Sequence, residues 1–185
     1  MDFNTSELID RLERLLAAPI RYEMRGMVGK VRPISTRPED IRQLDCSGFF
    51  EYIIYHTTIG RHDIPAGSRR QWSWLRDNGY TEVDYATYAP RNDDVVRAGF
   101  RAAEHRRDHE GRRVRSRAGH VWMVINGATY ESTTAVGNDG VCSLNWEYRL
   151  KRDEVDAFFT LGTAPGFGLG RSLRRLFAAG VRYLA

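Results

Sequence analysis

The strongest constraint on the fold is the stretch from Ala118 to Thr133, in which two β-prone runs flank Asn126 and Gly127. An Asn-Gly pair between such runs is the strongest short-range signal for a β-hairpin, because both residues tolerate the positive φ angles of a tight two-residue turn. The sequence therefore predicts two antiparallel strands joined by a turn at these two residues.

The register of this hairpin follows from the length of its loop. With a two-residue loop, His120 faces Thr133 and Trp122 faces Glu131. Glu131 then shares a face with His120, one diagonal step away, which is within reach of the imidazole directly or through a water. A loop that differs by one residue would bring Ser132 to that place instead.

A second constraint is the stretch from Gln43 to Phe50, where a thiol precedes an apolar segment that continues to Thr58. Asp45 is a favoured N-cap, and the apolar residues after it recur at helical spacing, which places Cys46 in the first turn of a helix. Free N–H groups and the positive end of the helix dipole stabilise a thiolate at such a position and make the sulfur nucleophilic. Position alone fits a small buried cysteine equally well.

Length and composition indicate a single domain with its own core. The chain has 185 residues, of which 42% are hydrophobic, and two cysteines, too few for a disulfide framework. The first residues are acidic and lead into a charged amphipathic helix rather than a secretory signal, and no window is apolar enough to span a membrane. We therefore expect a chain made in the cytoplasm, with a catalytic core at about 20–160, an N-terminal helix within 1–18 and a basic C-terminal helix at 171–185.

Coarser signals cover the rest of the chain. Glycines and prolines interrupt residues 20–40, which predicts a loop region. The other expected elements are helices at 6–16 and 68–78, a strand or loop at 80–88, a helix entering a strand at 93–103, one or two strands over 138–160, and a glycine-rich connection at 162–170.

The formal net charge of +4 is concentrated in one segment. Between Arg97 and Arg117, eight arginines stand against three acidic residues. From His105 to Arg117, Val114 is the single apolar residue, so this part is expected to form an exposed loop or a hairpin extension.

Two kinds of ligand come into question for this basic segment. Nucleic acid would be held by backbone electrostatics alone, because the segment has no aromatic residue for base stacking and no helix-turn-helix or zinc pattern. No specific nucleic acid is therefore expected. His105 and His109 have the spacing of metal ligands on a helix, but the arginines around them would repel a dication, so no metal site is expected there.

The local sequences around Cys46 and His120 resemble the signature blocks of a known family. Asp45-Cys46-Ser47-Gly48-Phe49 and Gly119-His120-Val121-Trp122-Met123-Val124-Ile125 are similar to the two blocks of the NlpC-type cell-wall cysteine peptidases, a papain-like family of peptidoglycan endopeptidases and amidases. Ile64-Pro65, followed by Arg69 and Gln71-Trp72, resembles the segment that the family carries between them. The chain is also similar to type VI secretion amidase effectors in one longer pattern. This pattern is Ala98-Gly99-Phe100, followed by an insertion and then by the His120 block.

The resemblance implies an α+β papain-like fold, with a catalytic cysteine at a helix N-terminus packed on an antiparallel sheet that carries the catalytic histidine. It implies that Cys46 is the nucleophile and His120 the general base, and it puts Glu131 at the third polar position, which is commonly histidine in the family. It also implies an oxyanion or substrate-binding role for a further set of residues, with no metal and no cofactor. This set consists of Tyr22, Ser47, Gln71 and Trp72.

The function that the resemblance implies is cleavage of an amide bond in peptidoglycan stem peptides. Without a signal peptide, the route to the wall would be a type VI apparatus or a phage lysis or virion system, with an immunity protein or that machinery as partner. Two alternatives stay open. One is a papain-like acyltransferase, or a protease or deamidase that acts on proteins. The other is a non-catalytic basic module that binds nucleic acid or wall polymer, such as a phage structural part.

Overall fold

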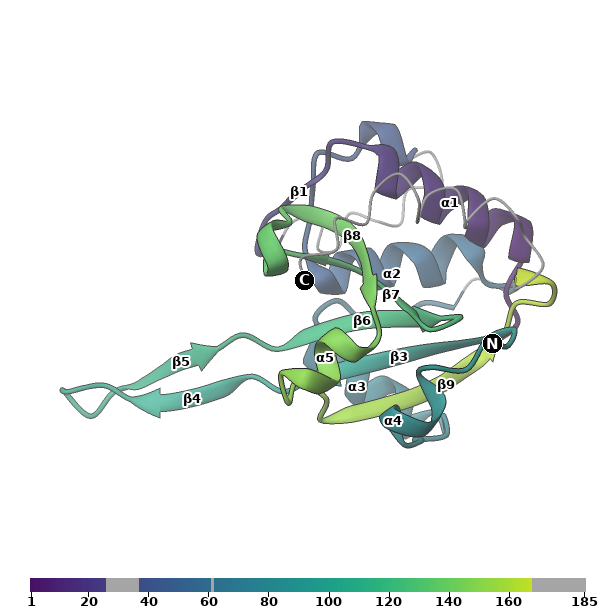
Figure 1. Cartoon of the computed structure of the whole chain (residues 1–185). Coiled ribbons are helices and arrows are strands. Elements are labelled where there is room, and N and C mark those ends of the chain that lie inside the picture. Colours follow the sequence, from purple (N-terminus) through teal and green to yellow (C-terminus); the bar gives the residue numbers. More distant parts are fainter. Residues whose placement is uncertain (26–36, 61, 168–185) are drawn as a thin grey trace.

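The computed structural model describes residues 1–25, 37–60 and 62–167. It is an α+β fold built on a five-stranded antiparallel sheet with strand order β8-β7-β6-β3-β9 (Figure 1). The strands are β3 (Val95–Arg101), β6 (His120–Ile125), β7 (Ala128–Thr133), β8 (Gly140–Asn145) and β9 (Ala157–Thr163). The α+β class predicted from the sequence is confirmed, whereas the basic helix expected at 171–185 lies outside the described residues.

Two helices are stacked on one face of this sheet. α1 (Thr5–Ala17) lies over α2 (Cys46–Thr57), which packs against β6 and β7 (Figure 1). The remaining helices are α3 (Ser68–Asp77), α4 (Tyr85–Tyr88), α5 (Glu147–Lys151) and the 3-10 turns η1 (Pro38–Asp40) and η2 (Ala135–Gly137). The N-terminal helix is part of the core, because Leu8, Leu12 and Leu15 are fully buried in the same cluster as α2.

The central strand β6 is buried on both faces. Val121, Met123 and Ile125 belong to the cluster that contains α1 and α2. Trp122 and Val124 point the other way and pack with a smaller cluster around α4. Because successive side chains of a strand alternate between faces, His120 at its start lies on the Trp122 side.

α2 is apolar almost all round because it lies between α1 and the sheet. Asp45, with extended backbone angles, caps the first turn by accepting a hydrogen bond from the N–H of Gly48 at 2.6 Å. Cys46 is the first residue of the helix. The helix start predicted from the sequence is therefore confirmed.

The β6–β7 hairpin has the turn and the register that the sequence predicts. Asn126 and Gly127 adopt φ angles of 50° and 74°, as a two-residue turn with positive φ at both positions requires. The pairs next to the turn are Ile125 with Ala128, Val124 with Thr129, and Met123 with Tyr130. Ser132 consequently points away from His120, and its hydroxyl donates to the carbonyl of Leu44 at 2.6 Å.

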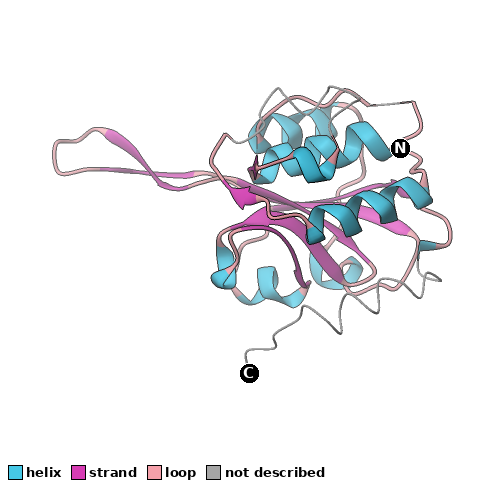
Figure 2. Ribbon diagram, turned by 90° about the horizontal axis from the view of Figure 1, so that it is seen from above, coloured by secondary structure: helices cyan, strands magenta, loops and turns pink. Residues whose placement is uncertain are grey.

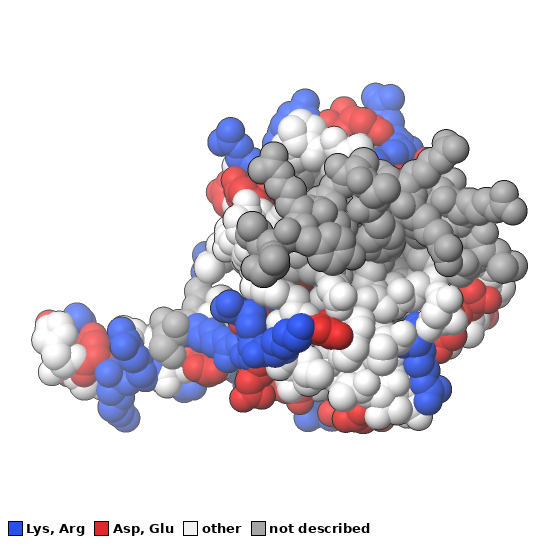
Figure 3. Space-filling model, in the orientation of Figure 1, with Lys and Arg blue, Asp and Glu red and all other residues white. Residues whose placement is uncertain are grey.

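A second hairpin projects away from the body of the molecule. β4 (Glu104–Arg107) and β5 (Arg113–Arg117) form a separate two-stranded antiparallel sheet (Figures 1 and 2). All residues of β4 are exposed, and Figure 3 shows basic side chains along this extension. We call residues 104–117 the basic hairpin. The exposed hairpin extension, one of the two forms expected for this segment, is confirmed.

Several local expectations are corrected by the structure. The strand expected within residues 93–103 is strand β3, but no helix precedes it there, because the chain is extended from Val95 to pair with β6 and β9. Residues 80–88 contain the single-turn helix α4, capped by the carboxylate of Asp84. Helix α5 lies where strands alone were expected. Gly162 belongs to β9 instead of a loop, because it pairs with Val96 of β3. A glycine is required there because a Cβ would meet the carbonyl oxygen of Met1 at 1.6 Å.

Candidate active site

Cys46 stands at a helix start that is held firmly in place. The Asp45 carboxylate accepts hydrogen bonds from the N–H of Gly48 at 2.6 Å and from the Ser47 hydroxyl at 2.8 Å. Its other oxygen accepts from the N–H of Arg25 at 2.9 Å. The first N–H groups of an α-helix have no acceptor within the helix, so the thiol lies beside free donors and the positive end of the helix dipole.

The chain around Cys46 is also tied to the sheet and to α3. Ser132 of β7 binds the carbonyl of Leu44, and the Nε2 of Gln71 in α3 donates to the carbonyl of Ser47 at 2.9 Å. Gln71 is fully buried, and the partly buried Trp72 packs against the core. Gln71 thus helps to hold the helix start, while a contact of Gln71, Trp72 or Ser47 with a substrate stays a prediction.

Strand pairing brings Tyr22 close to this helix start. β1 (Arg21–Tyr22) runs parallel to β2 (Gln43–Leu44), and Tyr22 pairs with Leu44, two residues before Cys46. The N–H of Tyr22 donates to the carboxylate of Asp139 at 3.1 Å, and its side chain is half-buried. A role for Tyr22 at an oxyanion site stays a prediction.

His120 brings Cys46 and Glu131 together. Its Nε2 lies 2.6 Å from Oε2 of Glu131, and the Cys46 thiol is close enough to the imidazole to act on its protonation. Cys46 and His120 are 5% and 4% exposed and Glu131 is fully buried. Burial acts to lower the pKa of His120, but the charges and hydrogen bonds of Cys46 and Glu131 outweigh it, so the pKa lies above its ordinary value.

Glu131 is held at both carboxylate oxygens. Oε2 accepts from His120 and from Nη2 of Arg149, while Oε1 accepts from the Thr129 hydroxyl at 3.2 Å and from Nε of Arg149 at 3.3 Å. Burial acts to raise the pKa of Glu131, but His120 and Arg149 lower it further than burial raises it. Glu131 is consequently an ionised acceptor, and Nε2 of His120 carries the shared proton.

Arg149 and Glu154 extend this cluster. Arg149, 2% exposed, binds Glu131 with one end of its guanidinium and Glu154 with the other. Glu154 also forms ion pairs with further arginines, at 2.9 Å, 3.1 Å and 3.3 Å; these are Arg101, Arg152 and Arg117. The arginines lower the pKa of Glu154 to about 2, against burial, which acts to raise it.

Sequence reasoning missed both Arg149 and Glu154. They lie in a charged run, residues 147–154, that has the composition of a solvent-exposed segment. Only the pairing of β7 with β8, followed by the short helix α5, brings Arg149 back under Glu131. A local sequence signal for this contact is absent, because the two residues meet through the sheet and not through a motif.

The second cysteine is chemically distinct from the first. Cys142 in β8 pairs with Glu131 of β7 and is buried. Burial, reinforced by the charge of Glu131, raises the pKa of its thiol to about 12. Cys142 is therefore a protonated and unreactive thiol near neutral pH.

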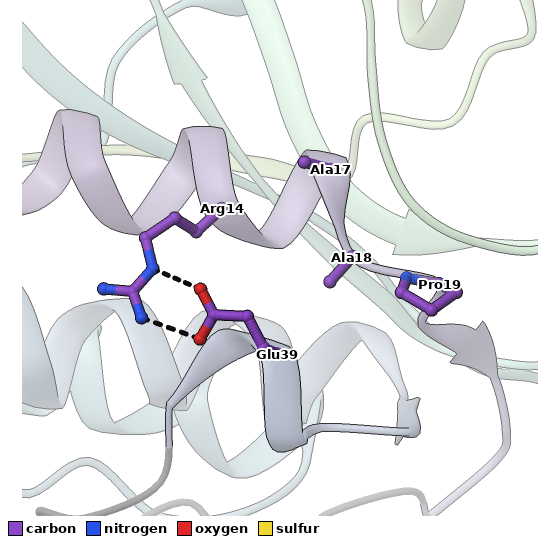
Figure 4. A pocket seen from close by; sticks show the side chains of 5 residues that line it. All are labelled: Arg14, Ala17, Ala18, Pro19 and Glu39. Carbon is purple, nitrogen blue, oxygen red and sulfur yellow. Dashed lines mark hydrogen bonds and ion pairs between the residues drawn. The ribbon is translucent and has the colours of Figure 1, made fainter.

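Other features of the described residues offer no competing site. A surface pocket of about 220 Å³ at the end of α1 is lined by Arg14, Ala17, Ala18, Pro19 and Glu39 (Figure 4). The two charged side chains of this pocket form an ion pair, with Nε and Nη2 of Arg14 at 2.6 Å and 2.7 Å from the Glu39 carboxylate. Among the described residues, no three His, Cys, Asp or Glu side chains are placed to hold a metal, and no helix is long and apolar enough to cross a membrane.

No protein-family model matches the chain, and a comparison with curated proteins finds no match. A thiol at a helix start, next to an imidazole that is bonded in turn to an ionised carboxylate, can form a thiolate–imidazolium pair. Such a pair is suited to nucleophilic attack on a carbonyl carbon.

Proposed function

We propose that the chain is a cysteine hydrolase of papain-like fold that cleaves an amide bond in the stem peptides of peptidoglycan. The observation that carries this proposal is the contact of His120 with both Cys46 and Glu131. Cys46 is the nucleophile, His120 the general base and acid, and Glu131 the carboxylate that orients the imidazole.

The reaction runs in two steps that restore the enzyme. The Cys46 thiolate attacks the amide carbonyl carbon while His120 holds the thiol proton as an imidazolium. The C–N bond then breaks, and His120 gives this proton to the leaving amine, which leaves a thioester on Cys46. In the second step His120 takes a proton from water, the water oxygen attacks the thioester, and the C–S bond breaks to release a carboxylic acid.

The first turn of α2 supplies the electrostatic part of this mechanism. The tetrahedral intermediate places a negative charge on the former carbonyl oxygen, next to the attacked carbon. The backbone N–H of Cys46, at the helix start, is a donor for this oxygen, and Tyr22 is the second candidate. The Asp45 and Gln71 hydrogen bonds keep this turn in one conformation, so the donor is in place before the substrate arrives.

The choice of peptidoglycan as substrate rests on two features. The sequences around Cys46 and His120 resemble those of cell-wall peptidases. The basic hairpin also carries like charges directly opposite each other, since Arg107 pairs with Arg113. Opposed like charges destabilise a sheet, and a two-stranded hairpin has little stability of its own. An anionic polymer such as the cell wall would relieve this repulsion.

The proposal is tested by incubating the purified protein with peptidoglycan and following new free amines and shortened stem peptides by mass spectrometry. We expect cleavage by the wild type and by Cys142→Ser, and none by Cys46→Ala. Absence of cleavage by the wild type, or equal cleavage by Cys46→Ala, would rule out the proposed function.

The same experiment separates the alternatives. An acyltransferase would need an added amine acceptor and would yield a new amide in place of a free carboxylate. A protein-directed protease would leave the wall intact and cleave a protein substrate. A non-catalytic basic module would bind the wall without any Cys46-dependent product.

A further inference from the structure

Arg149 contacts the site without a part in the proposed reaction. Its Nη2 donates to Oε2 of Glu131, the same oxygen that accepts from His120, and its Nε donates to Oε1 at 3.3 Å. Both oxygens of one fully buried carboxylate are therefore bound by one guanidinium. The orientation of Glu131 is set by Arg149 as much as by His120.

Arg149 is itself fixed from its other sides. Its Nη1 binds Glu154, and its guanidinium lies 5.3 Å from the ring of Trp122. The His120 ring stacks on this same Trp122, with centroids 5.9 Å apart. One aromatic ring thus lies next to both the imidazole and the guanidinium, whose Nε2 and Nη2 atoms are 3.0 Å apart.

Arg149 supplies one of the two positive charges next to Glu131. With Cys46 as thiolate and His120 as imidazolium, the four groups that meet at the imidazole are two negative and two positive. Loss of the guanidinium would remove one of these two positive charges, while Arg101 would remain as a more distant cation that acts on Cys46. A buried excess charge is relieved by binding a proton, because every nearby acid gains proton affinity when a cation is removed.

We infer that Arg149 is a positioning residue that keeps Glu131 ionised and oriented, and thereby sets the pH at which the Cys46–His120 pair holds a reactive thiolate. The inference rests on the thiol–imidazole pair of the proposed function, but it does not depend on the substrate. It assigns a task to the charged run of α5 that the sequence does not reveal.

The other titratable groups that face this cluster do not change charge near neutral pH. Burial raises the pKa of Cys142 in β8 to about 12 and raises that of Tyr85 in α4 as well. Glu154, with a pKa of about 2, stays ionised. The remaining charged neighbours of Glu154 are arginines from β3, β5 and the chain after α5, namely Arg101, Arg117 and Arg152. A change in the pH dependence of Cys46 alkylation therefore does not come from these groups.

The test is the pH dependence of Cys46 alkylation by iodoacetamide in the full chain, read by mass spectrometry of the Cys46 peptide. In Arg149→Gln, which keeps a donor but loses the charge, we expect the alkylation midpoint to rise by about one pH unit or more. Arg149→Lys keeps the charge and should stay near the wild type. Arg152→Gln is the matched control, because Arg152 binds Glu154 and is 57% exposed, and its midpoint should not move.

A folded Arg149→Gln protein with the wild-type midpoint would overturn the inference, because a residue with a purely structural role lowers stability without moving a titration. Circular dichroism at each pH verifies folding. If Arg149→Gln does not fold, Arg149→Lys is the deciding variant. A rise of its alkylation midpoint by a full pH unit, although the charge is retained, would also overturn the inference. Wild-type alkylation with a low midpoint but no peptidoglycan cleavage would refute the proposed function and leave the role of Arg149 intact.

Discussion

Oε2 of Glu131 accepts a hydrogen bond from Nε2 of His120 at 2.6 Å, at a position where Glu131 is fully buried. Burial of a carboxylate acts to raise its pKa, yet the pKa of Glu131 lies below its ordinary value because His120 and Arg149 stabilise the ionised form. The ionised carboxylate thus holds the imidazole with Nε2 protonated, next to Cys46.

Replacement of Glu131 by glutamine tests this relationship. Glu131→Gln keeps the size of the side chain but removes the charge that orients His120 and stabilises its cationic form. We expect turnover on peptidoglycan to fall by about 100-fold or more. The matched control is Glu147→Gln in α5, because Glu147 makes an exposed pair with Lys151. Unchanged turnover in a folded Glu131→Gln protein would exclude the orienting role.

Glu154 gives a prediction about acid stability. Its folded-state pKa of about 2 lies below the ordinary value of 4.5, so the ionised form stabilises the fold above pH 4.5. This contribution is lost as the pH falls from about 4.5 to about 2. We expect Glu154→Gln to lower the free energy of unfolding by about 3 kcal/mol at pH 7, because it leaves Arg149 without one buried partner.

Urea unfolding of wild type and Glu154→Gln at pH 7, 4 and 2.5 measures this difference. The gap between the two proteins should narrow with each step toward acid. A gap that stays constant with pH would mean that Glu154 stabilises the fold by packing and not by its charge.

Gly99 is a site where one methyl group should disturb the active site from a distance. A Cβ at this position in β3 would lie 2.3 Å from the ring of Trp122, the residue that supports both His120 and Arg149. We expect Gly99→Ala to cost about 1–3 kcal/mol of stability and to lower turnover further than the stability loss explains. Thermal unfolding and peptidoglycan cleavage measure the two effects.

A compensating change makes this prediction sharper. Trp122→Phe removes the part of the indole that the new methyl group would meet, since the close atoms belong to its six-membered ring and Nε1. The double variant Gly99→Ala/Trp122→Phe should therefore be more stable than Gly99→Ala alone. If it is less stable, the close approach to Trp122 does not explain the glycine.

Local signals made part of this site predictable from sequence. Asp45 before an apolar run marks a helix start, and Asn126-Gly127 fixes the loop length and hence the face of Glu131. Each depends on residues within a few positions of one another. The pairing of His120 with Glu131 follows from such a signal, because a two-residue loop leaves one register.

The remainder depends on contacts between distant segments. Residues 93–103 have no clear period because β3 is buried on both faces, and Gly99 is there to admit the Trp122 ring. Arg149 is a long cation in a charged run, which is the usual composition of a surface. It is buried because it forms ion pairs with two buried carboxylates, Glu131 and Glu154. The local sequence does not indicate that these two carboxylates lie next to each other in the fold.

The basic hairpin gives the prediction that separates wall binding from catalysis. Arg106 and Arg113 are exposed on β4 and β5, outside the Cys46–His120–Glu131 cluster. In a Cys46→Ala background, we expect Arg106→Gln/Arg113→Gln to reduce co-sedimentation with peptidoglycan several-fold at low salt. The difference should vanish near 1 M salt, where the Debye length is about 3 Å.

The matched control changes the same net charge elsewhere. Arg76 lies in the last turn of α3 and Arg91 lies over the ring of Tyr88; both are exposed, and neither belongs to the basic hairpin. Arg76→Gln/Arg91→Gln should sediment like the parent protein, because position and not net charge determines the contact. With Cys46 restored, the hairpin variant should cleave a short soluble stem peptide at the wild-type rate. Equal loss of sedimentation in both variants would assign wall affinity to overall charge, and a slower cleavage of the short peptide would place the hairpin in the catalytic site.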